Sequence, residues 1–475
     1  MPTPTKTGKR TSGLPAKTRL QWSGLSLAIA LFLFPIILPI SGLDGPQSRM
    51  LGIFLAAICL WVTEAIPLTA TAVGVIFLEV VLISDAAIVP VGADATSAKV
   101  YFASLANPVL ILFLGGFMIA DGAAKYGLDK NLAALLLRPF GGSARLTLLG
   151  LMSITALLSA FMSNTATTAA MFAVVSPILK ALPTRRARAG VALAIPVAAN
   201  LGGIATPVGS PPNAIAIGAL AEKQIYLTFA GWIALSLPIV LVLLLFSWGV
   251  LSTVALPVGT QLELEMKVDF DRSRAAIWFY LITALTIALW LTESLHGVAS
   301  TIVGFFPVVA FLATQVMDGE DLKKISWPVL WLVAGGIALG VGVGATELDK
   351  WLLGSINWQS FSVLWLLLLL ALVAVGMSNV ISNSASANLL VPLTLGLGAS
   401  ISVDQGTVAV VIAIACSLAM CLPISTPPNA IAYATGTITN RAMLLMGLVV
   451  GILGIILLAF VMPFYWYGVG LLPVN

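Results

Sequence analysis

An unusual polar motif occurs twice in this chain, each time inside a long apolar stretch. The two copies begin 219 positions apart and read Ser159-x-x-x-Ser163-Asn164-Thr165 and Ser378-x-x-x-Ser382-Asn383-Ser384. A second pair of matching segments follows in the same order, Gly209-Ser210-Pro211-Pro212-Asn213 and Ser425-Thr426-Pro427-Pro428-Asn429. Because the matching blocks keep one order over roughly 200 residues, they indicate an internal duplication, far longer than a solenoid repeat.

Composition limits where such a chain can fold. Hydrophobic residues make up 59% of the 475 positions and charged residues only 9%, so we expect an integral membrane protein. The pattern predicts an all-α polytopic fold of two inverted repeats, with about eleven transmembrane helices and two re-entrant helical hairpins. The candidate spans are 22–42, 48–66, 68–84, 107–121, 226–256, 274–292, 298–316, 326–345 and 441–470. The candidate hairpins are 145–180 and 357–398, and the broken segments are 187–220 and 406–438.

Basic residues predict the orientation in the membrane. If the N-terminus is cytoplasmic, 19 of the 23 lysines and arginines fall on the cytoplasmic side, and the exceptions are Arg49, Lys99, Lys223 and Lys350. This bias predicts a cytoplasmic N-terminus and an outside C-terminus. It also explains the net charge of +4 without a nucleic-acid partner, because the basic residues lie in separate loops. Residues 1–21 are too polar for a signal peptide and are expected to form a cytoplasmic tail. Short loops and the lack of a glycosylation sequon favour a bacterial inner membrane.

The two Ser-Asn tips lie in stretches without any charged residue, 146–179 and 351–403. Lipid cannot satisfy the backbone groups that a chain reversal frees, so each tip must be shielded by protein or face water. A hairpin of two half-helices meets this need and leaves a helix N-terminus at the tip, where free N–H groups favour an anion. Alternatively, the hydroxyls bond back to carbonyls of their own helix. The costly asparagine and the duplication favour a binding role.

The Pro-Pro-Asn segments predict a second pair of breaks. Consecutive prolines remove two backbone donors, so the carbonyls just before Pro211 and Pro427 become free acceptors. Carbonyl, hydroxyl and amide oxygens are hard neutral ligands that suit an alkali cation such as Na+. The alternative is a simple proline kink.

The absence of charge at the tips restricts the mechanism. A buried, unpaired anion is costly, so bound cations are expected to offset the charge of an anionic substrate. Symport of an anion with Na+ is the simplest solution, and proton coupling is disfavoured because proton relays use intramembrane carboxylates or histidines. An enzyme is not expected, since neither tip has a base that could activate a serine. A channel would not need duplicated ion sites.

Several other residues are expected to be structural. Glu64 and Glu293 end apolar helices beside Trp61 and Trp290, which favours interfacial anchoring over ion binding. His296 is interpreted as a loop residue with its hydrogen bonds satisfied, and the three cysteines as small core residues. Gly336, Gly340 and Gly344 form a glycine stripe on one helix face, which permits close approach of another helix. The stripe could serve a dimer interface or packing within the chain, and the sequence does not favour either role.

Taken together, these motifs resemble the divalent anion:sodium symporter family, which includes sodium/dicarboxylate, citrate and sulfate carriers. The resemblance runs from about residue 48 to 440 and rests on Trp61-Val62-Thr63-Glu64-Ala65-Ile66-Pro67, the two tips and the two Pro-Pro-Asn segments. It implies a homodimer of the elevator type, in which a scaffold domain supports a mobile transport domain. The scaffold would comprise 22–140 and 261–356, and the transport domain 141–260 and 357–475.

The resemblance also implies the ligands. The first Na+ site would use Ser159, Ser163, Asn164 and the carbonyl of Gly209, and the second Ser378, Ser382, Asn383 and the carbonyl of Ser425. The substrate carboxylates would meet Asn164, Thr165, Asn383 and Ser384, with Thr426 and Pro427 close by.

Two features refine the expected cargo. Ser384 stands where the dicarboxylate carriers of this family have threonine, so the hydroxyl donor is kept but a methyl group is missing. The arginine that follows the first tip in the family's exchanger branch is absent at Ala166-Thr167-Thr168, which favours a symporter. The resemblance therefore implies Na+-coupled import of a C4-dicarboxylate such as succinate, malate or fumarate. Dicarboxylate exchange and Na+-coupled citrate or sulfate transport remain alternatives.

Overall fold

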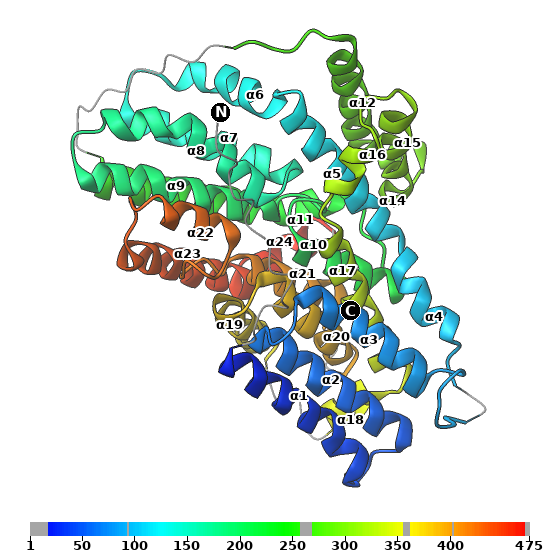
Figure 1. The fold of residues 1–475 in the computed structure, drawn as a ribbon. Coiled ribbons are helices and arrows are strands. Elements are labelled where there is room, and N and C mark those ends of the chain that lie inside the picture. Colours follow the sequence, from blue (N-terminus) through cyan, green and yellow to red (C-terminus); the bar gives the residue numbers. More distant parts are fainter. Residues whose placement is uncertain (1–17, 93–94, 257–267, 355–361, 401–402, 471–475) are drawn as a thin grey trace, which may run out of the picture.

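The structure is a computed structural model that describes residues 18–92, 95–256, 268–354, 362–400 and 403–470. Within these ranges every regular element is a helix (Figure 1), and nine helical segments are long and apolar enough to cross a membrane. The predicted all-α polytopic fold is confirmed. Most of the expected cytoplasmic tail lies outside the described residues, and the first helix begins at Arg19.

The described part of the first half contains eleven α-helices and two short 3-10 helices. They are α1 (Arg19–Ile37), α2 (Gly45–Thr63), α3 (Leu68–Ile83), α4 (Ala98–Ala103), η1 (Ser104–Ala106), α5 (Pro108–Lys125), α6 (Leu128–Leu137), η2 (Arg138–Phe140), α7 (Ala144–Phe161), α8 (Asn164–Ala181), α9 (Arg185–Ile204), α10 (Pro211–Glu222) and α11 (Phe229–Ala255).

The second half contains a series of helices in the same order as α5 to α11. Its elements are α12 (Arg274–Leu291), α13 (Glu293–His296), α14 (Ser300–Val303), α15 (Phe305–Ala313), α16 (Gly319–Lys324), α17 (Trp327–Ala345), α18 (Leu348–Gly354), α19 (Val363–Val380), α20 (Asn383–Ser400), α21 (Gln405–Ser417), α22 (Pro427–Ala434), α23 (Asn440–Phe460) and α24 (Met462–Gly468). The series α5 to α11 thus corresponds to α17 to α23, as the duplicated motifs predict.

The hairpins and breaks fall where the motifs place them. Two residues separate α7 from α8, and the N-cap of α8 is Ser163, whose hydroxyl accepts a hydrogen bond from the Ala166 N–H. In the second repeat Ser382 lies between α19 and α20 and accepts from the Ala385 N–H in the same way. Both α10 and α22 begin with two prolines, at positions where a helix needs no backbone donor.

The two repeats are packed through each other. Within each repeat both arms of the hairpin contact the broken helix, α9 in the first and α21 in the second. The short helix after each break instead contacts the hairpin of the other repeat, so α10 packs on α20 and α22 packs on α8. Figure 1 shows α7, α8 and α9 side by side, with α22 and α23 next to α9.

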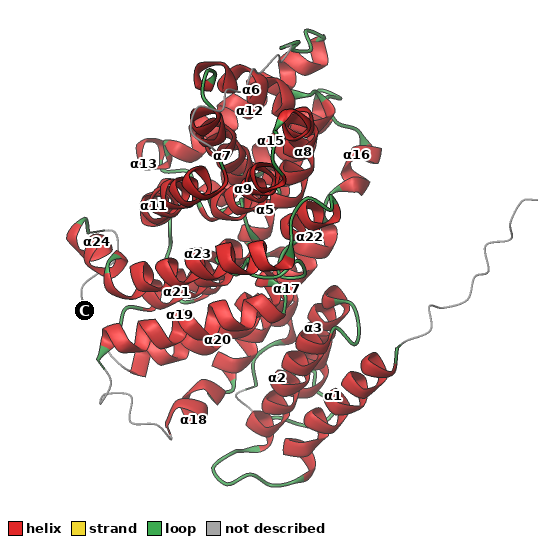
Figure 2. Cartoon of the chain, turned by 90° about the vertical axis from the view of Figure 1, so that its left-hand side faces the viewer, coloured by secondary structure: helices red, strands yellow, loops and turns green. Residues whose placement is uncertain are grey.

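Helix α17 joins this body to α1, α2 and α3, which lie together in Figure 2. The glycine stripe of α17 allows the close contact: a Cβ at Gly336 would collide with the Asn388 side chain, and one at Gly340 would touch Pro392, both on α20. Gly344 faces the Lys223 ammonium group. The stripe therefore serves packing within the chain.

Trp61 and Trp290 are buried and are not interfacial anchors. Each indole N–H donates to the carbonyl of the first residue of a later helix, at 3.2 Å to Leu68 of α3 and at 3.0 Å to Ser300 of α14. The Glu293 carboxylate accepts from the Phe229 N–H at the start of α11. These contacts give Glu293 and both tryptophans a role in the framework.

Candidate functional site

The first tip brings three oxygen atoms close together. The Ser159 hydroxyl oxygen lies 2.7 Å from the Asn164 amide oxygen and 2.8 Å from the Ala199 carbonyl oxygen of α9. A hydroxyl has one proton and can donate to only one of these acceptors. The result is a cluster of neutral oxygens from a hydroxyl, an amide and a carbonyl group, which are ligand types that suit an alkali cation.

The second tip has the same arrangement. The Ser378 hydroxyl oxygen lies 2.8 Å from the Asn383 amide oxygen and 2.7 Å from the Cys416 carbonyl oxygen of α21. Both serines thus reach a carbonyl of a neighbouring helix instead of bonding back to their own. The alternative, in which these two hydroxyls bond back to their own helix, is therefore not what the structure shows.

The asparagine of each Pro-Pro-Asn segment bonds to backbone carbonyls of the break that precedes it. The Asn213 amide donates to the carbonyls of Gly203 at 2.9 Å and Thr206 at 2.7 Å. In the second repeat the Asn429 amide donates to the carbonyls of Met420 at 2.9 Å and Leu422 at 3.0 Å. The breaks are therefore built turns with bonded carbonyls, and these asparagines act first as donors to the backbone, a role that the motif alone did not indicate.

Each break lies beside its own tip. A Cβ at Gly209 would come within 3.1 Å of the Ala160 carbonyl oxygen, one residue after Ser159. Ser425 donates to the carbonyl of Asn379, the corresponding residue of the second repeat, at 3.1 Å. The structure thus brings the predicted Gly209 and Ser425 to the first and second serine clusters.

The predicted substrate residues differ in exposure. Thr165 and Pro427 are exposed, whereas Asn164, Asn383 and Ser384 are half-buried and Thr426 is buried. The hydrogen bonds of the described residues do not join Asn164 directly to Asn383, although α22, which follows Thr426, contacts α8 of the first hairpin.

Among the described residues, the Thr426 hydroxyl acts only as a hydrogen-bond acceptor. Its hydroxyl oxygen accepts from the Asn200 amide at 3.2 Å and from the Asn429 N–H at 3.3 Å. Because a hydroxyl oxygen accepts at two positions and donates at one, both acceptor positions are filled and the proton is left to donate to another group. A hydroxyl that can still donate a hydrogen bond suits a carboxylate ligand.

Two residues near the tips were missed by the motif search. Gly203 lies against Asn164, and a Cβ there would be 2.3 Å from the amide oxygen. Asn200 is 1% exposed and bonds to residues of the second break. An isolated asparagine in the apolar part of a broken helix is the signal that could have identified Asn200.

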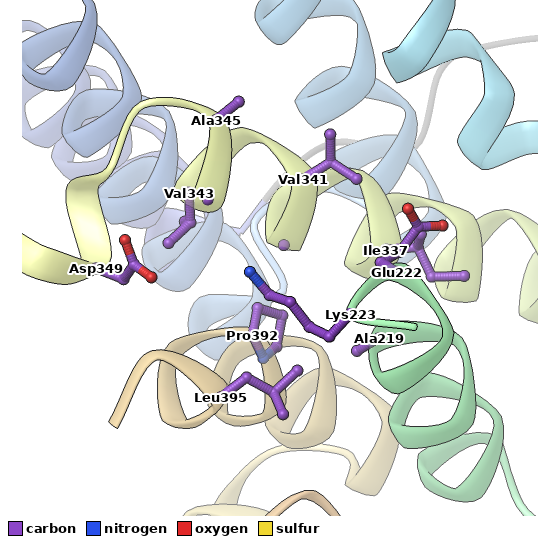
Figure 3. A pocket seen from close by; sticks show the side chains of 12 residues that line it. Ala219, Glu222, Lys223, Ile337, Val341, Val343, Ala345, Asp349, Pro392 and Leu395 are labelled. Atoms are coloured by element: carbon purple, nitrogen blue, oxygen red, sulfur yellow. The ribbon is translucent and has the colours of Figure 1, made fainter. Parts of the chain in front are cut away.

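A cavity of about 190 Å3 lies elsewhere, between α10, α17, α18 and α20 (Figure 3). The Lys223 side chain extends into it from the end of α10, and Asp349 lies across from it. Helix α10 separates Lys223 from Pro211 by twelve residues, or about 18 Å at 1.5 Å per residue. None of the predicted tip residues lines this cavity.

Two interlocked repeats, each with a hairpin tip and a broken helix in the apolar interior, are typical of secondary membrane transporters. Comparisons with known proteins agree. A family model described as citrate transporter matches residues 58–415. A sodium-dependent dicarboxylate transporter, SdcS of Staphylococcus aureus, is 30% identical and is covered over 91% of its length and 93% of this chain. An uncharacterized transporter of Haemophilus influenzae is 29% identical, with 99% of it and 96% of this chain covered.

The chain belongs to this family of citrate and sodium-dependent dicarboxylate transporters, as the motifs suggested. Among solved structures, the YdaH transporter of Alcanivorax borkumensis aligns with a TM-score of 0.58 at 14% identity, over 86% of this chain and 100% of that one. At this identity the similarity supports the fold alone. The protein is therefore a multi-pass membrane transporter.

Proposed function

We propose that this transporter couples the import of a divalent anion to Na+, with C4-dicarboxylates such as succinate, malate or fumarate as its cargo. The observation that carries the proposal is the pair of matching oxygen clusters at Ser159 and Ser378, each made of a hydroxyl, an amide and a carbonyl oxygen and free of charged side chains. Relatives named sodium-dependent dicarboxylate transporters support the cargo and the ion.

Each cluster is proposed to bind one Na+. The first site would take its oxygens from Ser159, Ser163, Asn164 and Gly209, and the second from Ser378, Ser382, Asn383 and Ser425. Neutral oxygens suit Na+ at this place, because the anion that binds next to the ion compensates its positive charge and the protein ligands need none.

The dianion is proposed to bind between the two tips. Its carboxylates would accept from the amide groups of Asn164 and Asn383 and from the hydroxyls of Thr165, Ser384 and Thr426, beside Pro427. The Thr426 hydroxyl accepts from two donors, which leaves its proton for the substrate. The two Na+ ions would balance the two negative charges of the substrate, so its transfer would not leave a buried, uncompensated charge.

Movement is proposed to follow the elevator scheme in a homodimer of the inner membrane, with the N-terminus inside. Segments 22–140 and 261–356 would form the scaffold and segments 141–260 and 357–475 the transport domain. The contact of α17 with α20 would lie at the boundary of the two domains, and the buried Asn388 amide of α20 donates across it to the Leu332 carbonyl of α17 at 2.9 Å.

Replacing Na+ with K+ or choline is expected to abolish uptake into proteoliposomes, because without bound Na+ the neutral clusters cannot offset the substrate charge. If more Na+ charges enter than the dianion neutralises, an inside-negative potential should accelerate uptake, since each net charge gains about 2.3 kcal/mol per 100 mV. Radiolabelled succinate uptake with imposed ion gradients measures both effects. Uptake that is equally fast in K+ would contradict Na+ symport and would point to dicarboxylate exchange.

Citrate or sulfate is the second candidate cargo. The matched family model is described as a citrate transporter, and Ser384 leaves more space than threonine would at the second tip.

Ser384→Thr is expected to change the ranking of succinate, malate, citrate and sulfate as competitors without eliminating transport. One added methyl group in a pocket changes discrimination by about 10–200-fold. Ser384→Ala, which removes the hydroxyl donor, should instead weaken all carboxylate substrates. Competition assays on purified protein compare the three forms, and an identical ranking in wild type and Ser384→Thr would show that this residue does not shape the pocket.

A further inference from the structure

Asn200 connects the two half-sites. Its amide donates one proton to the Thr426 hydroxyl and the other to the Asn429 amide oxygen, each at 3.2 Å. Both acceptors belong to the second break, whereas the preceding residue, Ala199, contributes its carbonyl to the Ser159 cluster of the first tip. Two consecutive residues of α9 therefore contact the first proposed Na+ site and the second break, respectively.

Asn200 contacts the residues that shape the second break. Asn429, which accepts from Asn200, itself donates to the carbonyls of Met420 and Leu422. Thr426, the other acceptor, follows Ser425, whose carbonyl is a proposed Na+ ligand. One side chain of α9 thus connects the helix that contacts the first tip to the residue next to a proposed ligand of the second site.

The counterpart of Asn200 in the second repeat does not make this connection. Ser378 bonds to the carbonyl of Cys416 as Ser159 does to that of Ala199, so Ser417 corresponds to Asn200. By the same correspondence, the Asn200–Asn429 bond would become a bond from Ser417 to Asn213.

That bond is missing. The Ser417 hydroxyl and the Asn213 amide oxygen are both buried, and neither has a hydrogen-bond partner among the described residues. Serine has a shorter side chain than asparagine and does not bridge the gap. The connection between the half-sites is therefore made from one side, by Asn200.

We propose that Asn200 is a positioning residue that couples the two half-sites, so that a cation bound at the first tip orders the second break and makes Na+ binding cooperative. This inference rests on the proposed Na+ coupling. Coupling needs an element that both sites affect, and the Ala199–Asn200 pair is such an element.

The test is the Na+ dependence of thermal stability in purified protein without substrate, measured for wild type, Asn200→Ser, Ser417→Asn and Ser417→Ala. Asn200→Ser should raise the half-maximal Na+ concentration about tenfold and make a sigmoidal curve hyperbolic, because two buried hydrogen bonds are lost. Ser417→Asn, which can bond to Asn213, should lower the half-maximal concentration. Ser417→Ala is the matched control and should leave the curve unchanged, since this hydroxyl has no partner in the described structure.

The outcomes separate this inference from the proposed function. Wild-type protein whose stability and uptake do not respond to Na+ would contradict the proposed function itself. A normal Na+ response in wild type with an unchanged midpoint and steepness in Asn200→Ser would overturn the role of Asn200, even if the variant melted at a lower temperature. If Asn200→Ser does not fold, Ser417→Asn decides the question, and an unchanged curve in that variant overturns the coupling.

Discussion

Replacing either Asn164 or Asn383 with alanine is expected to lower Na+-dependent uptake by about 100-fold or more. Each amide oxygen lies in a serine cluster, at 2.7 Å from the Ser159 hydroxyl and at 2.8 Å from the Ser378 hydroxyl. That orientation leaves the NH2 group of each amide for the substrate, so one substitution removes a cation ligand and a hydrogen-bond donor together. Initial rates of dicarboxylate uptake in proteoliposomes measure the loss.

Both variants should remain folded and inserted, because the two asparagines are half-buried at the first position of their helices and fill no core. Size-exclusion chromatography and thermal unfolding without Na+ provide the control. Wild-type uptake in both variants would refute the assignment of these residues to the site.

Gly203→Ala is expected to reduce uptake nearly as much as Asn164→Ala while leaving stability almost unchanged. A Cβ at this position would lie 2.3 Å from the Asn164 amide oxygen and 2.7 Å from its amide nitrogen, so the amide must move. The end of a short side chain moves at little cost to the fold, but the amide would leave the Ser159 cluster. Uptake and the melting temperature, measured on the same preparation, separate the two effects.

Gly249→Ala is a matched control for this substitution. Gly249 lies in α11, and a Cβ there meets no atom within 4 Å. The added methyl group should stabilise the helix by up to about 1 kcal/mol and leave uptake unchanged.

Full activity in Gly203→Ala would mean that the position of the Asn164 amide is not critical.

Local patterns in the sequence determined the membrane class, the duplication and the positions of the breaks. Lipid restricts a spanning chain to helices, so a polar tip or a pair of prolines in an apolar segment must mark an interruption. For that reason the boundaries at Ser163, Pro211, Ser382 and Pro427 could be predicted from single motifs. The duplication then identified the same positions twice.

Contacts between distant segments were decided by the tertiary structure. The exchange of α10 and α22 between the repeats places Asn200 of the first repeat against Thr426 and Asn429 of the second, more than 220 positions away. Apolar helices can pack in many registers, so hydrophobicity does not select one of them. Close fits such as Gly203 against Asn164 and Gly336 against Asn388 arise only when two particular helix faces meet, because packing depends on the shape of both surfaces.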